Sequence, residues 1–265
     1  MRLGINSARR AIKVSENLRR QQRFVNDVSH ELRTPLTIIR GYVDLLENCG
    51  ADDPELFKEA VTSIKNSAQN MQNLVENLLF LARADQGRQP LTKVPVDLDE
   101  LLKKFVEAHQ SPRVQISKLA HCKILADAEF LKKMFAAFLD NALRYSSPDT
   151  PVKVELTTSN DEATLKFIDK GIGIAKEDCA KIFDRFYRTD KARTKINNTE
   201  NSVGLGLSVA KWIADHHNIK IKVRSKFGEL SLDVPKDRNG TFEPQIVKNR
   251  QKDISAIDEK IINVY

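Results

Sequence analysis

A histidine flanked by a serine and a glutamate stands within FVNDVSHELRTPL, residues 24–36. Glu31 follows His30 and could accept a proton from one ring nitrogen, which would leave the other nitrogen as a nucleophile. Thr34 comes four residues after the histidine, so in a helix it lies on the same face one turn away. Pro35 removes a helical hydrogen bond beside this group and should bend the helix. The segment therefore suits a helix that presents one reactive imidazole.

Polar residues in FLDNALRYS, at the end of a predicted helix, could bind a nucleotide. Asn141 offers a neutral amide oxygen, which suits a Mg²⁺ ion that keeps most of its waters. Arg144 would supply a phosphate-binding cation and Tyr145 an aromatic face.

The motif DKGIGI follows a predicted strand. Asp169 could accept a hydrogen bond from an amino group, and Gly171 and Gly173 would let the backbone approach a ligand closely. Taken alone, this motif is weak, because it is more often an ordinary turn.

Two more motifs complete the set. IFDRFYR, residues 182–188, is an aromatic cluster that could be no more than core packing. GLGLSVAKWIADHH, which begins at Gly204, is a glycine-rich turn that opens a helix, and its free N–H groups suit phosphate. The polar, lid-like loop TDKARTKINNTENS lies between them. His216 and His217 diverge by about 100° on this helix, so we expect both at the surface and neither as a metal ligand.

Two long amphipathic helices are predicted to position His30. In the first, apolar residues recur at alternating steps of three and four, an a/d seam that places His30 at position f, farthest from the partner helix. This phase excludes a core histidine but leaves an ordinary surface histidine open. Asp53 and Pro54 suit the N-cap and first position of the second helix. The two seams are Val25, Val28, Leu32, Pro35, Ile39, Tyr42 and Leu46, and then Phe57, Val61, Ile64, Ala68, Met71, Val75, Leu78 and Ala82.

A single hairpin of this kind buries little apolar surface, so we expect a second copy to complete a homodimeric four-helix bundle. After a polar linker at residues 83–95, the pattern changes to mixed helices and strands. Helices are predicted near 97–108, 127–145 and 204–217, and strands near 113–117, 123–126, 152–158 and 163–169. The predicted fold class is α+β.

The composition, with 41% hydrophobic and 30% charged residues, is that of a soluble globular protein. No run of about 18 apolar residues is present to span a membrane, and the start lacks the apolar core of a signal peptide. Cys49, Cys122 and Cys179 are scattered, which argues against a disulfide framework or zinc site and suits a reduced cytoplasmic compartment. The net charge of +7 is mixed with acidic residues and fits a nucleotide or an acidic partner as well as nucleic acid.

SHELRTPL resembles the H-box of sensor histidine kinases, in their dimerisation and histidine-phosphotransfer domain, and the resemblance runs from about Arg20 to Ala84. It implies that His30 is the phosphoacceptor and that Glu31 is the base that assists its attack on ATP. It also implies that Thr34 orients water when the protein works in reverse, as a phosphatase of its partner.

The downstream motifs, in their order, resemble the N, G1, F and G2 boxes of the histidine-kinase catalytic domain. This resemblance implies a Bergerat-type α/β sandwich that binds ATP, over about residues 91–218. Asp169 would then read adenine, Asn141 would hold Mg²⁺, and Arg144 and Arg188 would contact phosphates. The other implied nucleotide contacts are Tyr145, Gly171, Gly173, Gly204, Leu205, Gly206 and Leu207, with Gly204 and Gly206 shaping the lid.

Two positions depart from the family pattern. Ala137 stands where the N-box usually carries an extra asparagine, and Ser202 stands at the first glycine of the G2 box. Either could lower activity, although neither removes the central ligands.

From about Lys222 the chain resembles the N-terminal region of mutator-type insertion-sequence transposases, through GELSLDVPKDRNGTFEPQIV. This resemblance implies a kinase gene interrupted near residue 218 by a mobile element. IKIKVRS and ELSLDV alternate with period two around a Phe-Gly turn, so we expect a hairpin in the place of the family's last strands. Residues 245–265 are expected to form a frayed tail.

The expected organisation begins with a continuation of a signalling helix over residues 1–20 and a dimerisation and phosphotransfer domain over 21–84. A linker over 85–95, a catalytic domain over 91–234 and a transposase-like tail over 235–265 follow. The chain as given is expected to be cytoplasmic, and its parent to be attached to a membrane through upstream segments missing here.

The leading hypothesis is an ATP-dependent protein-histidine kinase that passes a phosphoryl group from His30 to an aspartate of a response regulator, with ATP and Mg²⁺ as cofactors. One alternative is an impaired remnant that only binds the regulator as a dimer. Another is a nucleic-acid-binding protein led by the tail, although we expect no nucleic acid as partner.

Overall fold

The computed structural model describes residues 2–49, 53–159, 162–189, 203–224 and 229–235. Its internal contacts separate a helical hairpin from a mixed α/β unit, with the main boundary between Ala82 and Arg83. The α+β class predicted from the sequence is confirmed.

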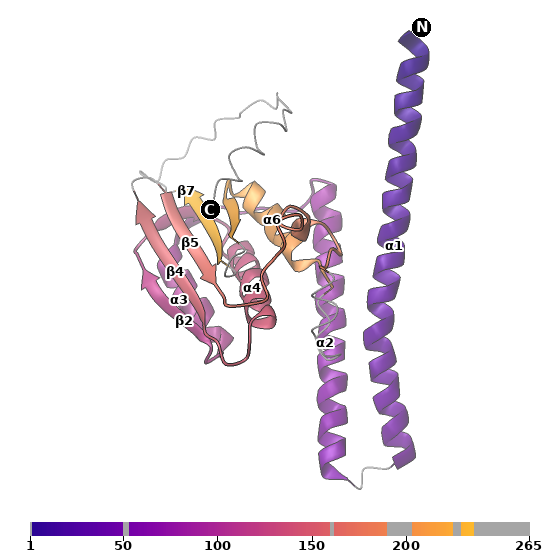
Figure 1. The fold of residues 1–265 in the computed structure, drawn as a ribbon, viewed down its shortest axis with the longest axis vertical. Helices are drawn as coiled ribbons and strands as arrows, with labels where there is room; N and C mark the ends of the chain where they lie inside the picture. Colours follow the sequence, from indigo (N-terminus) through magenta and orange to yellow (C-terminus); the bar gives the residue numbers. More distant parts are fainter. Residues whose placement is uncertain (1, 50–52, 160–161, 190–202, 225–228, 236–265) are drawn as a thin grey trace. The chain divides into compact units, whose positions relative to one another are not determined.

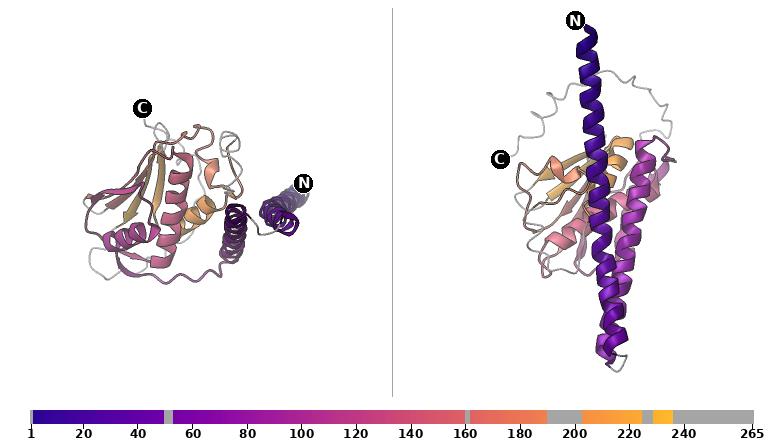
Figure 2. Two further views of the ribbon diagram at one scale, coloured as in Figure 1. Left: turned by 90° about the horizontal axis from the view of Figure 1, so that it is seen from below. Right: turned by 90° about the vertical axis from the view of Figure 1, so that its right-hand side faces the viewer.

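The hairpin consists of α1 (Arg2–Cys49) and α2 (Pro54–Asp85), which run antiparallel side by side (Figure 1 and Figure 2). Asp53 caps α2, because its Oδ1 accepts hydrogen bonds from the backbone N–H groups of Glu55 at 2.9 Å and Leu56 at 3.2 Å. Pro54 follows as the first helical residue, so the predicted start of the second helix is confirmed.

The predicted seam is confirmed in α1 but is out of phase in α2. In α1, Pro35 is buried and most other seam residues are half-buried, although Val25 is 55% exposed. In α2, Phe57 and Val75 are more than two-fifths exposed, and the buried stripe lies one residue earlier along much of the helix. The buried residues of α2 are Ala60, Ser67, Leu74, Phe80 and Leu81. The prediction was wrong because α2 carries two adjacent apolar stripes, and spacing alone does not say which one its own chain covers.

The α/β unit contains a five-stranded sheet in the order β2-β4-β5-β7-β6 and a two-stranded ribbon of β1 and β3. The pair β2–β4 is parallel and the other neighbours are antiparallel. The strands are β1 (Val94–Asp97), β2 (Val114–Leu119), β3 (Lys123–Ala126), β4 (Val152–Ser159), β5 (Glu162–Ile168), β6 (Lys220–Arg224) and β7 (Glu229–Pro235). The helices are α3 (Leu98–His109), α4 (Ala128–Tyr145) and α6 (Gly206–His216), with a 3₁₀ turn at Lys181–Phe183.

The core of this unit lies between α4 and one face of the sheet. Buried side chains alternate along β4 and β5, so that Val154 pairs with Phe167 on the same face. Phe135 and Phe138 of α4 pack against Phe167, with ring centroids 6.2 and 5.9 Å away. This packing fixes α4, the helix that ends in FLDNALRYS, on the sheet.

His217 corrects a sequence prediction, because it is 5% exposed and not a surface residue. Its Nε2 accepts a hydrogen bond from the backbone N–H of Asp127 at 3.0 Å, and its Nδ1 lies 2.8 Å from the carbonyl of Ile213. Asp127 is the N-cap of α4, so the histidine connects the end of α6 to the start of α4. His216 is exposed, as predicted.

The predicted C-terminal hairpin is present as β6 and β7, and β7 lies between β5 and β6. The transposase-like origin of this segment stays a prediction, and the expected tail at 245–265 lies outside the described residues. In the region of the predicted linker, α2 continues to Asp85 and β1 begins at Val94, and the predicted domain boundaries stay a prediction.

Candidate functional site

His30 is exposed on α1, as its predicted seam position requires. The hydroxyl of Thr34 lies one turn away, 3.5 Å from the carbonyl oxygen of His30, and Glu31 is half-buried. The helix continues through Pro35, which has no N–H to donate to the carbonyl of Glu31. The three predicted residues of this group therefore lie within two turns of one helix, with the imidazole exposed to solvent.

The last two turns of α4 carry three half-buried residues that were predicted to bind a nucleotide, Asn141, Arg144 and Tyr145. Ala137 precedes Asn141 by one turn on the same face. A Cβ placed on Gly206, the first residue of α6, would lie 3.6 Å from the Cβ of Ala137. The start of α6 therefore faces the same side of α4 as Asn141.

The Asp169 turn packs directly against the end of α4. The backbone N–H of Ile172 donates to the carbonyl of Tyr145 at 3.2 Å, and Ser146 and Gly171 form an isolated β-bridge. A Cβ on Gly171 would come within 2.6 Å of the Tyr145 carbonyl oxygen and 2.7 Å of the Asp169 Oδ1 atom, so only glycine fits. The structure thus brings together two motifs that are separated in the sequence.

The Asp169 carboxylate has an unusual pKa for an aspartate. Burial raises this pKa to about 6, and the hydrogen bond that Oδ1 accepts from the Gly171 N–H, at 2.7 Å, acts in the opposite direction. The group is therefore ionised at neutral pH and can accept a hydrogen bond from an amino group. It becomes a protonated acid as the pH falls below 6.

The other predicted site residues have individual features that suit a nucleotide. The Nε atom of Arg188 is buried and has no hydrogen-bond partner within the described ranges, so a phosphate oxygen would satisfy it. Gly173 has φ of 71° and Gly204 of 70°, a left-handed backbone that glycine adopts without strain. Leu205 is buried, and Gly206 and Leu207 begin α6, whose first N–H groups are suited to an anion.

Asn141 is suited to be one ligand of a magnesium ion that binds together with the nucleotide. The described residues contain no group of three or more His, Cys, Asp or Glu side chains that could hold a metal by themselves. A single asparagine oxygen, with phosphates and water as the other ligands, is a set that Mg²⁺ accepts. Ser202 and most of the loop TDKARTKINNTENS lie outside the described residues.

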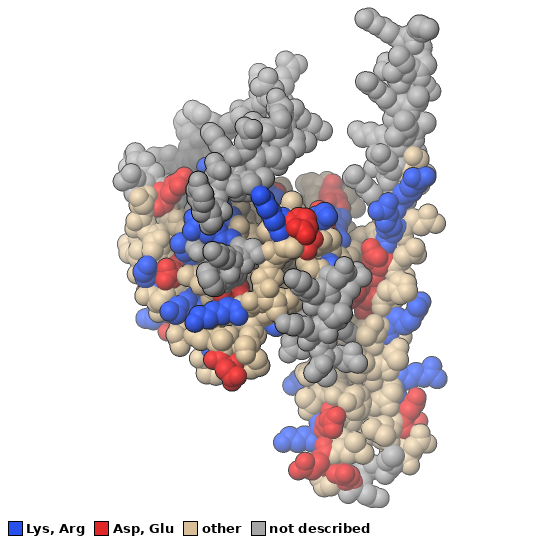
Figure 3. Space-filling model, viewed as in Figure 1, with Lys and Arg blue, Asp and Glu red and all other residues tan. Residues whose placement is uncertain are grey.

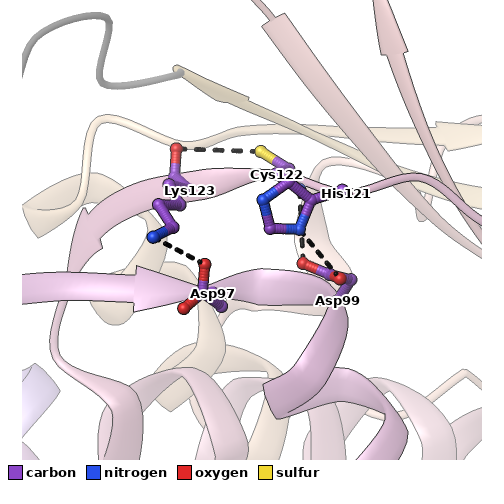
Figure 4. Close-up of polar contacts among 5 residues, drawn as sticks. All are labelled: Asp97, Asp99, His121, Cys122 and Lys123. Atoms are coloured by element: carbon purple, nitrogen blue, oxygen red, sulfur yellow. Dashed lines mark hydrogen bonds and ion pairs between the residues drawn. The ribbon is translucent and has the colours of Figure 1, made fainter.

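Sequence reasoning missed a polar cluster where β1 and β3 meet α3 (Figure 4). Asp99 lies 3.1 Å from the Nδ1 atom of His121 and accepts from the Cys122 N–H at 3.3 Å, and Lys123 lies 3.4 Å from Asp97. Burial opposes ionisation, but these hydrogen bonds hold the pKa of Asp99 below its usual range. The cluster joins the ribbon to α3 and contains none of the predicted site residues.

Comparison with protein families matches two regions of the chain. The His Kinase A (phospho-acceptor) domain matches residues 20–87, and the histidine kinase-, DNA gyrase B- and HSP90-like ATPase matches residues 126–241. The first match contains His30, and the second contains Asn141 and Asp169 and runs past β7.

Curated relatives include the sensor histidine kinase YkoH of Bacillus subtilis (strain 168), 38% identical over 231 residues, which are 86% of this chain and 50% of that protein. The signal transduction histidine-protein kinase ArlS of Staphylococcus aureus (strain USA300) is 33% identical over 82% of this chain and 49% of its own. The chain thus spans about half the length of the curated relatives it matches.

Solved structures share the fold. The Acinetobacter baumannii histidine kinase AdeS matches with a TM-score of 0.60 and 23% identity, covering 78% of this chain and 98% of that one. Histidine kinase ThkA in complex with response regulator protein TrrA matches with a TM-score of 0.62 and 23% identity, covering 84% of this chain and 64% of that one.

Proposed function

Because the chain belongs to the sensor histidine kinase family, with a phospho-acceptor domain ahead of an ATPase domain, we propose that it is an ATP-dependent protein-histidine kinase that autophosphorylates His30. The phosphoryl group then passes to an aspartate of a response regulator. The observation that carries this proposal is an exposed histidine in the phospho-acceptor region, together with the junction of the Asn141 and Asp169 motifs in the ATPase region.

His30 is the nucleophile in this reaction. One ring nitrogen forms the N–P bond while the bond between the γ-phosphorus and the oxygen of the departing ADP breaks, and Glu31 takes the imidazole proton. Transfer to the regulator breaks this N–P bond and forms an acyl phosphate on its carboxylate. Thr34 would orient water when the protein acts as phosphatase of the regulator.

The ATPase region positions the nucleotide. Asp169 accepts from the adenine amino group, Asn141 holds Mg²⁺, and Arg144 and Arg188 neutralise phosphate charge. The metal ion supplies further charge neutralisation when it is bound. Phosphoryl transfer depends mainly on such positioning and charge neutralisation, so these side chains are of the types that the reaction needs.

A second copy of the chain is the partner that the hairpin requires. Among the side chains that the structure describes, seven large apolar ones of α1 and α2 are exposed in the single chain, and exposed apolar surface of this kind is typical of an interaction site. They are Val25, Leu36, Val43, Phe57, Val61, Val75 and Leu79. We propose that a homodimeric four-helix bundle covers them.

The alternative, an impaired remnant that only binds its regulator, rests on Ala137. This residue lies one turn before Asn141 on the same face and brings a methyl group where a polar side chain would reach the nucleotide. ATP turnover separates the two functions: a remnant would bind the regulator and transfer no phosphate.

Nucleic-acid binding has less support. Lys and Arg side chains are interspersed with Asp and Glu over the described surface that Figure 3 shows, and a continuous basic stripe would be expected for DNA.

The described helices include none that is both long and apolar enough to cross a bilayer.

Incubation with γ-labelled ATP and Mg²⁺ tests the proposed kinase. We expect an acid-labile, base-stable label on His30, and we expect His30→Gln to remove it without disturbing the dimer, because the imidazole is exposed. His216→Gln, which changes another exposed histidine, is the matched control and should keep the label. Label that survives in His30→Gln would contradict the assignment.

A further inference from the structure

The end of α4 is held by groups from outside the helix. Ser146, which follows Tyr145, has an extended backbone with φ of −98° and ψ of 156°, so there is no glycine cap. The last carbonyls of a helix have no partners within it. Here the carbonyl of Ala142 accepts from the Ser146 hydroxyl at 2.6 Å, that of Leu143 from Arg113 at 3.0 Å, and that of Tyr145 from the N–H of Ile172.

Arg113, immediately before β2, makes one of these bonds and three more to the segment that follows the helix. Its Nη1 donates to the Leu143 carbonyl, and its Nη2 donates to the Ser146 hydroxyl at 2.7 Å and to the Ser147 carbonyl at 2.8 Å. Its Nε donates to the Thr150 carbonyl at 3.2 Å. A planar guanidinium fixes the directions of these four bonds, and its charge faces the negative end of the helix dipole.

The end of α4 that Arg113 binds lies beside both proposed nucleotide ligands. Asn141 is two residues before Leu143 on α4, and the Tyr145 carbonyl accepts from the N–H of Ile172 in the turn that follows Asp169. We propose that Arg113 is a positioning residue for nucleotide binding, which keeps the magnesium ligand and the adenine acceptor at one spacing. This inference rests on the proposed function, since both ligands are assigned there.

The test compares Arg113→Met and Arg113→Lys in the full chain. We expect Arg113→Met to weaken ATP binding about tenfold and to raise the Mg²⁺ concentration needed for half-saturation, because Asn141 is no longer held against the Asp169 turn. Arg113→Lys keeps the positive charge but loses the planar guanidinium with its fixed N–H directions. Its affinity for ATP should therefore fall between those of Arg113→Met and the wild type. The amide resonance of Ile172 should shift in both variants. Lys118→Met, on the strand β2 that Arg113 precedes and with an exposed side chain, is the matched control and should bind ATP normally.

Wild-type ATP affinity and Mg²⁺ dependence in Arg113→Lys and Arg113→Met would overturn the inference, and so would weaker binding without any change at Ile172. If Arg113→Met does not fold, Arg113→Lys decides alone, since wild-type affinity there overturns the inference and reduced affinity with a shifted Ile172 amide supports it. Failure of the proposed function has a different signature, in which Asn141→Ala and Asp169→Asn also leave ATP affinity unchanged.

Discussion

The ionised form of Asp169 is the form that can bind the ligand, but it lowers the stability of the folded domain. Its carboxylate is partly buried at the end of β5, and burial raises its pKa to about 6 from an ordinary value near 3.8. Protonation of a group with a raised pKa in the folded state contributes stability that is fully present below pH 3.8 and is lost as the pH rises through 6. At neutral pH the nucleotide-free domain therefore contains an ionised carboxylate whose charged form is disfavoured by burial.

Asp169→Asn should separate these two effects. We expect the variant to bind ATP more weakly and yet to unfold at higher temperature than the wild type at pH 7.5 without nucleotide. The gain in stability should be roughly 1 kcal/mol once solvent screening is allowed for, and it should shrink between pH 6 and pH 4. Thermal midpoints across this pH range, with and without ATP, measure both effects. Asp149→Asn, at an exposed position, serves as control, and an equal gain there would contradict the argument.

At the scale of elements, His217 fastens α6 to α4. Burial lowers the pKa of His217, and the nearby charge of Lys93 adds to this, while the Ile213 carbonyl and Asp127 act in the opposite direction. A histidine whose folded-state pKa lies below its unfolded value of 6.5 contributes stability above that pH, and this stability is lost as the pH falls through the folded pKa. Its pH dependence is therefore opposite in sign to that of Asp169.

His217→Phe removes the acceptor for the Asp127 N–H and the ring N–H near the Ile213 carbonyl. At pH 7.5 we expect a loss of about 1–3 kcal/mol in the free energy of unfolding. The difference from wild type should narrow at pH 5.5, because below 6.5 the unfolded chain gains a proton on this histidine that the folded chain disfavours. Urea unfolding at the two pH values measures this, and His216→Phe should show little change at either. A constant difference across pH would mean that the histidine acts only through packing.

The two stripes of α2 make a second prediction at this scale. Leu74 is 2% exposed, so Leu74→Ala should lower the free energy of unfolding by about 2–5 kcal/mol. Val75 is 44% exposed in the single chain, so Val75→Ser should leave the helices folded but weaken the dimer. Sedimentation and thermal unfolding of both variants separate the outcomes. Loss of helix in Val75→Ser with an intact dimer would reverse the assignment of the two faces.

Local patterns predicted most helices and strands, and the features that were missed depend on long-range contacts, while the roles of the site residues stay a prediction. The N-cap at Asp53 and the α4 helix follow from neighbouring residues, and both were predicted. His217 was misplaced because its partner Asp127 is 90 residues away. Arg113 was missed for the same reason, since its acceptors lie 30 or more residues along the chain. Neither contact leaves a periodic signal.

At the scale of the whole molecule, the strands after α6 complete the sheet of the α/β unit. All seven residues of β5 pair with β7, and all five residues of β6 pair with β7 as well. The predicted hairpin is therefore correct, but the sequence did not indicate that its second strand would be the inner one. The ATPase match also continues to residue 241, across the segment for which a transposase-like origin is only predicted.

Three chain lengths test whether this hairpin supports nucleotide binding. A cut after Asn218 removes both strands, and a cut after Arg224 removes β7 and thereby the only strand that pairs with β6 in the described sheet. Both cuts leave the edge of β5 unpaired, so we expect similar and large decreases in the thermal midpoint of the ATPase domain. A cut after Pro235 retains every strand pair that the structure describes and should match the full chain. ATP should raise the midpoint only where β7 is present, because Asp169 directly follows β5. Equal midpoints and equal ATP responses at all lengths would show that β7 is dispensable, and the impaired-remnant function would then be favoured over the active kinase.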